Sequence, residues 1–171
     1  RTLDDGRPIY TRRLSVQEVA TRIERYHRPY HQMLQQLMDR AHARFGRVLH
    51  VNCHSMNAVS GAMGEGGPGV ARADFVLGDR DGSTCSAEIT SAVFEHLRGL
   101  GYSVKINDPF KGVELVRAYS DPSRERHSLQ LEINKRIYMN QSSGEKLAHF
   151  SVLQAQLMQM LKALHQQFGP A

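Results

Sequence analysis

Two polar side chains on predicted strands belong to residue types that carry chemistry. His54 closes the strand-like stretch RVLHVNCH at residues 47–54, at the end where open α/β sheets place their ligand sites. Glu132 lies in the middle of a stretch at residues 127–135 that alternates strictly between apolar and polar residues. A histidine can ligate a metal, and a glutamate can take a proton from water. The pair is a candidate reactive site if the fold brings both onto one side of a sheet.

Each of these residues also has a purely structural explanation. An imidazole at a strand end can be packed without any further role, and the stripe formed by Gln130, Glu132 and Asn134 could be a sheet face open to water. The second explanation is weaker in a sheet covered on both faces, because a buried carboxylate needs a partner. A glycine-rich loop at residues 60–71 follows His54 and is placed to close over a ligand.

The chain has nine histidines, and others among them also suggest a metal site. His27 and His31 are four residues apart on a predicted helix, which is the spacing that lets two imidazoles share one zinc. Pro29 lies between them and no glutamate stands beside the first, so two polar histidines next to a kink are the favoured interpretation. His50 shares a predicted strand face with His54 and is either its supporting partner or a packed imidazole.

The elements that would position these residues follow from the hydrophobic pattern. Ser15 and Glu18 form a capping box, after which apolar residues recur at three- and four-residue steps as far as Phe45. Pro29 predicts a kink or two abutting helices within this stretch. Further helices are predicted from Ser86 and from a second capping box, and strands are predicted at five places. That capping box is 142–145, and the strands are 47–54, 73–78, 102–107, 114–119 and 127–135.

Helices that alternate with short strands indicate one α/β domain over residues 1–171, with a parallel or mixed sheet covered on both faces. The net charge is +5, but the 22 Lys and Arg residues are scattered among 17 acids and no Trp is present, so we expect no nucleic-acid partner. We also expect no membrane partner, because no apolar run approaches the roughly 18 residues that a span needs.

The first ten residues, RTLDDGRPIY, are polar and lack the apolar centre of a signal peptide. The two cysteines, Cys53 and Cys85, are too few for a disulfide framework. We therefore expect a cytoplasmic protein.

Six blocks of the sequence, in this order, resemble the N-formylglutamate amidohydrolases. They span residues 6–139 and read GRPIYTRRLS, RYHRPYHQML, FGRVLHVNCHSM, DFVLGDRDGS, INDPFKGVELVRAYSDP and HSLQLEINKRIYM. The resemblance implies a phosphorylase/hydrolase-like fold similar to that of the zinc carboxypeptidases, with three layers in which helices cover both faces of a mixed sheet. It also implies zinc-dependent hydrolysis of N-formyl-L-glutamate to formate and glutamate, a step of histidine degradation.

The resemblance assigns expected roles to individual residues. The segment at 53–56, Cys-His-Ser-Met, matches a His-Ser pair whose histidine is a zinc ligand, and this makes His54 the expected ligand. Glu132 stands where the family has the glutamate that activates the zinc-bound water. The substrate is a dianion, so cationic side chains should bind its carboxylates. The candidates are Arg80, Lys111 and Arg117, each of which is alternatively a plain surface charge, together with Asn134.

The sequence also departs from the family pattern. Family members carry an upstream Pro-His-Ser-Gly motif and an acidic residue that resemble the other zinc ligands, whereas this chain begins at Arg1, after them. We therefore expect a domain truncated at its N-terminus, with one of three zinc ligands. Gly112-Val113 replaces a frequent pair of glycines, and Lys135 replaces a common arginine.

Two alternatives to this function stay open. One keeps the fold and changes the substrate to another N-acyl amino acid or a peptide. The other is a non-catalytic remnant that serves as a binding or oligomerising module. A homo-oligomer would follow if the long first helix exposes its apolar face.

Overall fold

A four-stranded sheet lies at the centre of the described chain, which comprises residues 2–3, 5–64 and 67–169 of a computed structural model. The elements in chain order are α1 (Val16–Arg22), the π-helical turn η1 (Ile23–His27), α2 (Arg28–Phe45), β1 (Val48–Met56), β2 (Phe75–Gly78), α3 (Ala87–Gly99), β3 (Val104–Ile106), α4 (Glu114–Ala118), η2 (Pro122–Arg124), β4 (Arg126–Asn134), η3 (Lys135–Ile137) and α5 (Phe150–Phe168). No helix within these residues is both long and apolar enough to cross a membrane.

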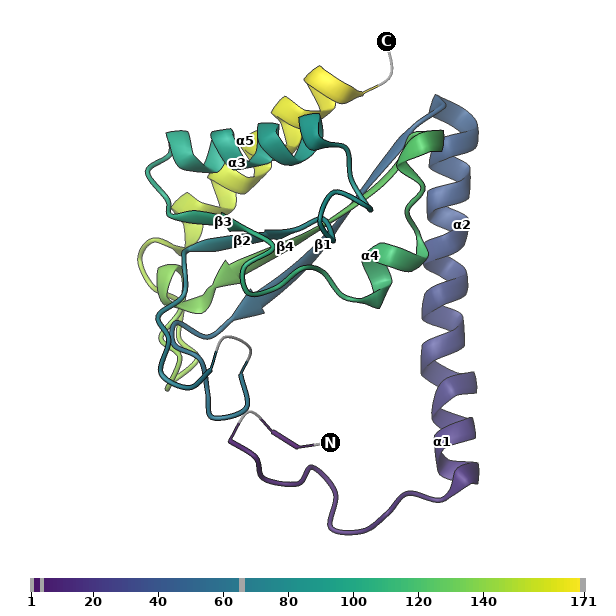
Figure 1. The fold of residues 1–171 in the computed structure, drawn as a ribbon, viewed down its shortest axis with the longest axis vertical. Helices are drawn as coiled ribbons and strands as arrows, with labels where there is room; N and C mark the ends of the chain where they lie inside the picture. Colours follow the sequence, from purple (N-terminus) through teal and green to yellow (C-terminus); the bar gives the residue numbers. More distant parts are fainter. Residues whose placement is uncertain (1, 4, 65–66, 170–171) are drawn as a thin grey trace.

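The sheet is mixed, with the strand order β1-β4-β2-β3 (Figure 1). β1 and β4 run parallel over nine paired residues each, from Val48 opposite Arg126 to Met56 opposite Asn134. β2 is antiparallel to β4 and parallel to β3. The predicted mixed α/β architecture is confirmed, and β1 forms one edge of the sheet.

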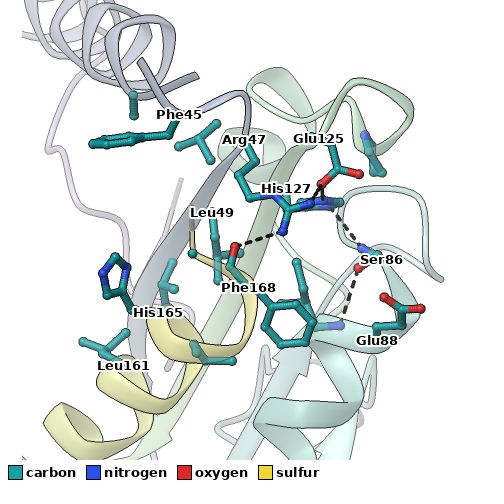
Figure 2. Close-up of a pocket in the computed structure, with 17 residues that line it drawn as sticks. Phe45, Arg47, Leu49, Ser86, Glu88, Glu125, His127, Leu161, His165 and Phe168 are labelled. Atoms are coloured by element: carbon teal, nitrogen blue, oxygen red, sulfur yellow. Dashed lines mark hydrogen bonds and ion pairs between the residues drawn. The ribbon is translucent and has the colours of Figure 1, made fainter. Parts of the chain in front are cut away.

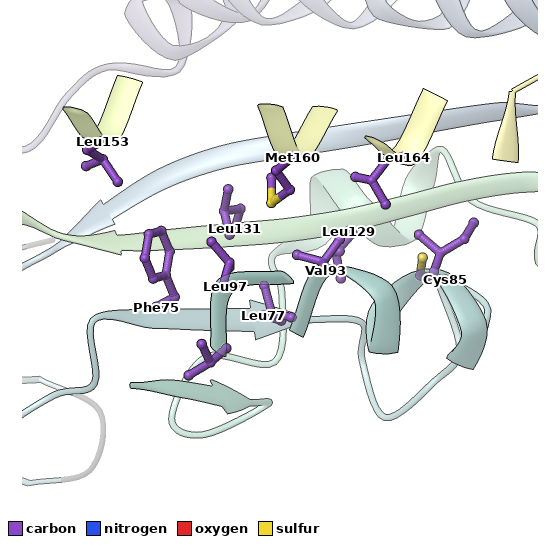
Figure 3. Close-up of a cluster of buried hydrophobic side chains, with 12 residues drawn as sticks. Phe75, Leu77, Cys85, Val93, Leu97, Leu129, Leu131, Leu153, Met160 and Leu164 are labelled. Carbon is purple, nitrogen blue, oxygen red and sulfur yellow. The ribbon is translucent and has the colours of Figure 1, made fainter. Parts of the chain in front are cut away.

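One face of the sheet is covered by α3 and α5, which lie side by side (Figure 1). Ser86 caps α3 as predicted, because its hydroxyl accepts a hydrogen bond from the Ile89 N–H. Figure 3 shows the core that these helices make with the strands, built from Phe75, Leu77, Val93, Leu97, Leu129, Leu131, Leu153, Met160 and Leu164 among others. Burying each large apolar side chain contributes about 1.5–3 kcal/mol. This core fixes the positions of β4 and β2.

The opposite face has a different cover. The five-residue helix α4 contacts β4 and β1, and α2 contacts β1 at the edge of the sheet (Figure 1). Within the described residues, therefore, helices cover only part of this face. The predicted complete helical layer is not confirmed there.

The first helix begins as the capping box predicts. The Ser15 hydroxyl accepts from the Glu18 N–H, and the Glu18 carboxylate accepts from the Ser15 N–H. The kink predicted at Pro29 takes the form of a π-helical turn just before it, in which the Arg28 N–H bonds to the Ile23 carbonyl. Proline has no N–H and crowds the carbonyl four residues earlier, so the wider turn lets the helix continue.

Two sequence predictions about elements are wrong. Residues 114–119 were expected to form a strand, but Glu114–Ala118 is helix α4, with Val116 fully buried and Glu114 ion-paired to Arg117 one turn later. The second capping box does not start the last helix, since α5 begins at Phe150. The Ser143 hydroxyl instead accepts from the Glu145 N–H inside a separate turn.

Candidate active site

The register of β1 and β4 brings the two candidate residues together. His54 is paired with Glu132, and Asn52 is paired with Gln130. Because side chains alternate along a strand, all four lie on the same face of the sheet. The distance from His54 Nδ1 to Glu132 Oε1 is 3.7 Å. The imidazole and the carboxylate, 78 positions apart in the chain, thus share one site.

The two side chains differ in exposure because their strands occupy different places in the sheet. Glu132 lies on β4, which has neighbours on both sides, and its side chain is 7% exposed. His54 lies on β1, and its side chain is 38% exposed. β1 is an edge strand and not a fully buried one, and Cys53, His54 and Ser55 are exposed, although its last residue is buried. A ligand can therefore reach the imidazole from solvent.

Hydrogen bonds connect this pair to its neighbours. The Gln130 side chain is buried; its Oε1 accepts from the Val113 N–H at 2.9 Å, and its Nε2 donates to Glu132 Oε1 at 2.9 Å. Asn52 Nδ2 lies 3.0 Å from His54 Nε2 and 3.5 Å from Gln130 Oε1. Sequence reasoning placed Gln130 in one stripe with Glu132 but gave it no role, and it did not single out Asn52. Strand alternation was the signal that could have identified them.

Two glycines allow the Val113 backbone to reach the sheet. A Cβ on Gly78 would lie 2.7 Å from the Gly112 nitrogen, and a Cβ on Gly112 would lie 2.8 Å from Val116 Cγ2. Gly112 also has a φ of +108°, which disfavours other residues. The segment at 111–113 therefore lies directly against the end of β2 and presents its N–H to Gln130.

The remaining candidate histidines have structural partners. His50 hydrogen-bonds with the Ser128 hydroxyl at 2.8 Å, and burial lowers the pKa of His50. His31 hydrogen-bonds with the Tyr119 hydroxyl at 2.6 Å and stacks on His27, with 4.0 Å between ring centroids. The favoured structural interpretation of His27 and His31 agrees with these contacts.

The three predicted cationic contacts have different surroundings. Arg80 is half-buried, and its Nη1 donates to the Gly112 carbonyl at 2.9 Å. Lys111 is exposed and pairs with Asp81 at 2.8 Å. The exposed Arg117 is paired with Glu114, its Nε donating to Oε2 at 2.7 Å. Lys111 belongs to the loop that contacts Gln130, and Arg80 binds the same loop through the Gly112 carbonyl.

Asn134 is fully buried and occupied by backbone partners. Its Nδ2 donates to the carbonyls of Arg72 and Ala73, and its Oδ1 accepts from the Arg136 N–H. These contacts support the turn into η3 and leave the amide facing the backbone.

A metal at this site would need more donors than the described residues supply. In this part of the chain, no group of three or more His, Cys, Asp or Glu side chains is arranged to hold a metal ion. A catalytic zinc takes three protein ligands. His54 and Glu132 by themselves do not fit a zinc centre, so no reaction step is assigned to a metal here.

A separate cavity of about 430 Å³ lies on the other side of the sheet, between the end of α2, the start of β1 and the end of α5 (Figure 2). Leu49 and Phe168 are among its lining residues, and Arg47 and His127 both contact Glu125 at its edge. His54 and Glu132 do not line it. Its position separates it from the candidate active site.

Comparison with known sequences identifies the family of this chain. Residues 1–139 match the N-formylglutamate amidohydrolase family, and the chain belongs to that family. An N-formylglutamate deformylase of Pseudomonas putida is 32% identical over 174 residues, covering 95% of this chain and 61% of that protein. One of Pseudomonas aeruginosa is 29% identical over 145 residues, covering 83% of this chain and 53% of that protein. The chain thus spans about half to three fifths of the length of these relatives.

Solved structures give the same result at the level of the fold. The crystal structure of an N-formylglutamate amidohydrolase from Ralstonia eutropha superposes with a TM-score of 0.83 and 40% identity, covering 94% of this chain and 57% of that one. A gene product of Agrobacterium tumefaciens has a TM-score of 0.58 at 18% identity and covers 88% of this chain and 55% of that one, which shows a shared fold.

Proposed function

We propose that this chain carries the water-activating part of an amidohydrolase site and that its reaction is the hydrolysis of N-formyl-L-glutamate to formate and glutamate, as in histidine degradation. The observation that carries the proposal is the 3.7 Å approach of His54 and Glu132 in a member of this family. A three-layer, phosphorylase/hydrolase-like fold of the zinc carboxypeptidase type is part of the same proposal. The covered α3/α5 face supports it.

The proposed reaction needs one water and one general base. Glu132 takes a proton from the water, whose oxygen attacks the formyl carbon. The carbon–nitrogen bond then breaks as Glu132 returns this proton to the nitrogen. The other proton of the water passes from the formic acid product to the amine, so formate and glutamate with a protonated amino group leave. The low exposure of Glu132 supports this role, because a carboxylate shielded from bulk water interacts more strongly with one bound water.

Arg80 is the best supported of the proposed substrate contacts. A guanidinium has five N–H donors, so the bond to the Gly112 carbonyl leaves others for a substrate carboxylate. Lys111 and Arg117 would first have to leave Asp81 and Glu114. The contribution of Asn134 would be indirect, since its amide binds backbone groups.

Zinc dependence stays a prediction within this proposal. A bound zinc would polarise the formyl carbonyl and lower the pKa of water, and His54 would be one of its ligands. The described residues supply too few zinc ligands by themselves. The number of zinc ions bound per chain, measured by metal analysis of the purified chain after zinc supplementation, tests the zinc dependence directly. About one zinc per chain is expected if further ligands join His54, and no bound zinc would remove the metal from the proposal.

The proposal also includes a cytoplasmic location, supported by the free state of Cys53 and Cys85. Self-association is included as well, supported by the exposed apolar side chains of α1 and α2.

Formate release tests the substrate. N-formylglutamate, N-formylaspartate and N-acetylglutamate are compared at equal concentration, with formate or acetate measured in each. Release only from N-formylglutamate supports the proposal. Turnover of another acyl compound favours a deacylase of different specificity, and no turnover at all favours the non-catalytic binding module.

Glu132→Gln tests the base. It keeps the shape of the side chain and removes the proton acceptor, so turnover should fall about 10²–10⁴-fold. The control is Glu95→Gln on the exposed side of α3, which should leave turnover unchanged. Undiminished turnover in Glu132→Gln would show that another group activates the water.

A further inference from the structure

We infer that Gln130 is the positioning residue of this site, because its single amide group holds the Glu132 carboxylate and is linked through Asn52 to the His54 ring. The inference rests on the proposed function for its catalytic meaning. The hydrogen-bond arrangement itself can be measured separately.

The orientation of the Gln130 amide is determined by a backbone group. The Val113 N–H can only donate, so the atom that it contacts at 2.9 Å must be the carbonyl oxygen Oε1. The other end of the amide is then Nε2, which lies 2.9 Å from Glu132 Oε1 and donates to it. An amide turned the other way would place its oxygen against a carboxylate and its NH₂ against an N–H. Both contacts would be repulsive.

The same oxygen orients Asn52. Asn52 Nδ2 lies 3.5 Å from Gln130 Oε1, which is already established as an acceptor, so this end of the Asn52 amide is the NH₂ group. It also lies 3.0 Å from His54 Nε2, which must therefore accept the hydrogen bond. The other ring nitrogen, Nδ1, lies 3.7 Å from Glu132 Oε1.

Gln130 is buried and is surrounded by paired backbone. Its side chain is 1% exposed, and its strand is paired on both sides, with β1 and with β2. The Val113 N–H comes from a loop whose close approach to Gly78 leaves no room for a side chain at that position. Positioning of this kind matters because a displacement of about 1 Å in a reacting group can cost about 10²-fold in rate.

Side-chain NMR tests the hydrogen bond without any need for activity. In the ¹⁵N-labelled chain, the Gln130 side-chain NH₂ should exchange with solvent roughly tenfold or more slowly than that of Gln154, an exposed glutamine on α5. Glu132→Gln replaces the charged acceptor and should move the donated Gln130 proton upfield. Equal exchange at both glutamines, or no shift in Glu132→Gln, overturns the inference whatever the substrate proves to be.

Kinetics test the consequence for catalysis. Gln130→Met keeps the length of the side chain and removes both polar ends, and it should lower kcat about 10²-fold while KM stays within about twofold. Gln154→Met is the matched control and should change neither constant. A normal kcat in Gln130→Met overturns the positioning role. If Gln130→Met does not fold, or if the wild-type chain releases no formate, the NMR comparison of wild type and Glu132→Gln decides the inference by itself.

Discussion

At the scale of single residues, the side chains of the site differ in the hydrogen bonds and ion pairs that they already make within the chain. Glu132 and Gln130 are held inside the sheet, and Lys111 and Arg117 are held at the surface by acids. Arg80 is intermediate, because one of its nitrogens binds a carbonyl of the loop beside the site. Arg80 therefore differs from the other two cations in its partner, which is a neutral carbonyl and not a carboxylate.

Replacing Arg80 by lysine tests this distinction. Lysine keeps the positive charge but loses the planar pair of donors that binds a carboxylate in two places. For N-formylglutamate we expect KM to rise about tenfold with kcat within about twofold, because the lost contact is made equally in the ground state and the transition state. Arg98→Lys, at an exposed position of α3, is the control and should leave KM unchanged. The assignment fails if the two variants behave alike in steady-state assays.

At the scale of elements, one carboxylate ties three segments together. Asp74, just before β2, accepts from the Ser103 N–H and hydroxyl at 2.9 and 2.6 Å and from Arg136 Nη2 at 2.7 Å. Burial would raise the pKa of Asp74, but these hydrogen bonds and the charge of Arg136 outweigh it, so the pKa is lowered. The contacts join the segments just before β2 and β3 to η3, which follows β4.

Acid unfolding should reveal this link. Since the pKa of Asp74 is lower in the folded chain than in the unfolded chain, the unfolded chain binds the proton first as pH falls. The stabilisation is then complete above the ordinary aspartate pKa of about 3.9 and is lost as pH falls through the lower folded value. Asp74→Asn should lower the free energy of unfolding by about 1–2 kcal/mol at pH 7 and have less effect at pH 2–3, as measured by urea titration at each pH. A pH-independent effect would contradict this account.

The elements also show where sequence patterns stop being informative. The five residues of α4 are too few to distinguish a helix from a strand by periodicity, and its conformation follows from the turn at Gly112 and the burial of Val116. Residues 142–145 have the spacing of a capping box, but no helix follows directly, because their side chains bond within a turn.

At the scale of the whole molecule, α1 and α2 extend away from the sheet (Figure 1). Among the described residues of these two helices only Met38 is buried, while Val16 is 88% exposed and Leu37 is 50% exposed. The apolar stripe read from the sequence therefore exists as a helix face, but it contributes little burial within this chain.

Two leucine variants test this contrast. Leu97→Ala removes a side chain that is 1% exposed in the core and should cost about 2–5 kcal/mol of unfolding free energy. Leu37→Lys should change that free energy by no more than about 0.5 kcal/mol, since surface substitutions are usually small in effect. Denaturant unfolding at low protein concentration measures both. A large loss in Leu37→Lys would mean that the stripe is covered in solution, and sedimentation velocity would then show whether a second copy covers it.

The sequence alone determined the mixed α/β class, most helices and strands, and the family resemblance. Its alternation also determined which residues share a strand face with His54 and which share one with Glu132. These are local properties, because periodicity, caps and glycines act over a few residues. Only the tertiary structure decided that β1 pairs with β4 in the register that joins His54 to Glu132, and that β1 is an edge strand. The structure also decided that the Val113 N–H orients Gln130. The pairing of two strands 78 residues apart depends on the core that they share and on close backbone contacts with other segments. The sequence of either strand by itself contains no pattern that predicts this pairing.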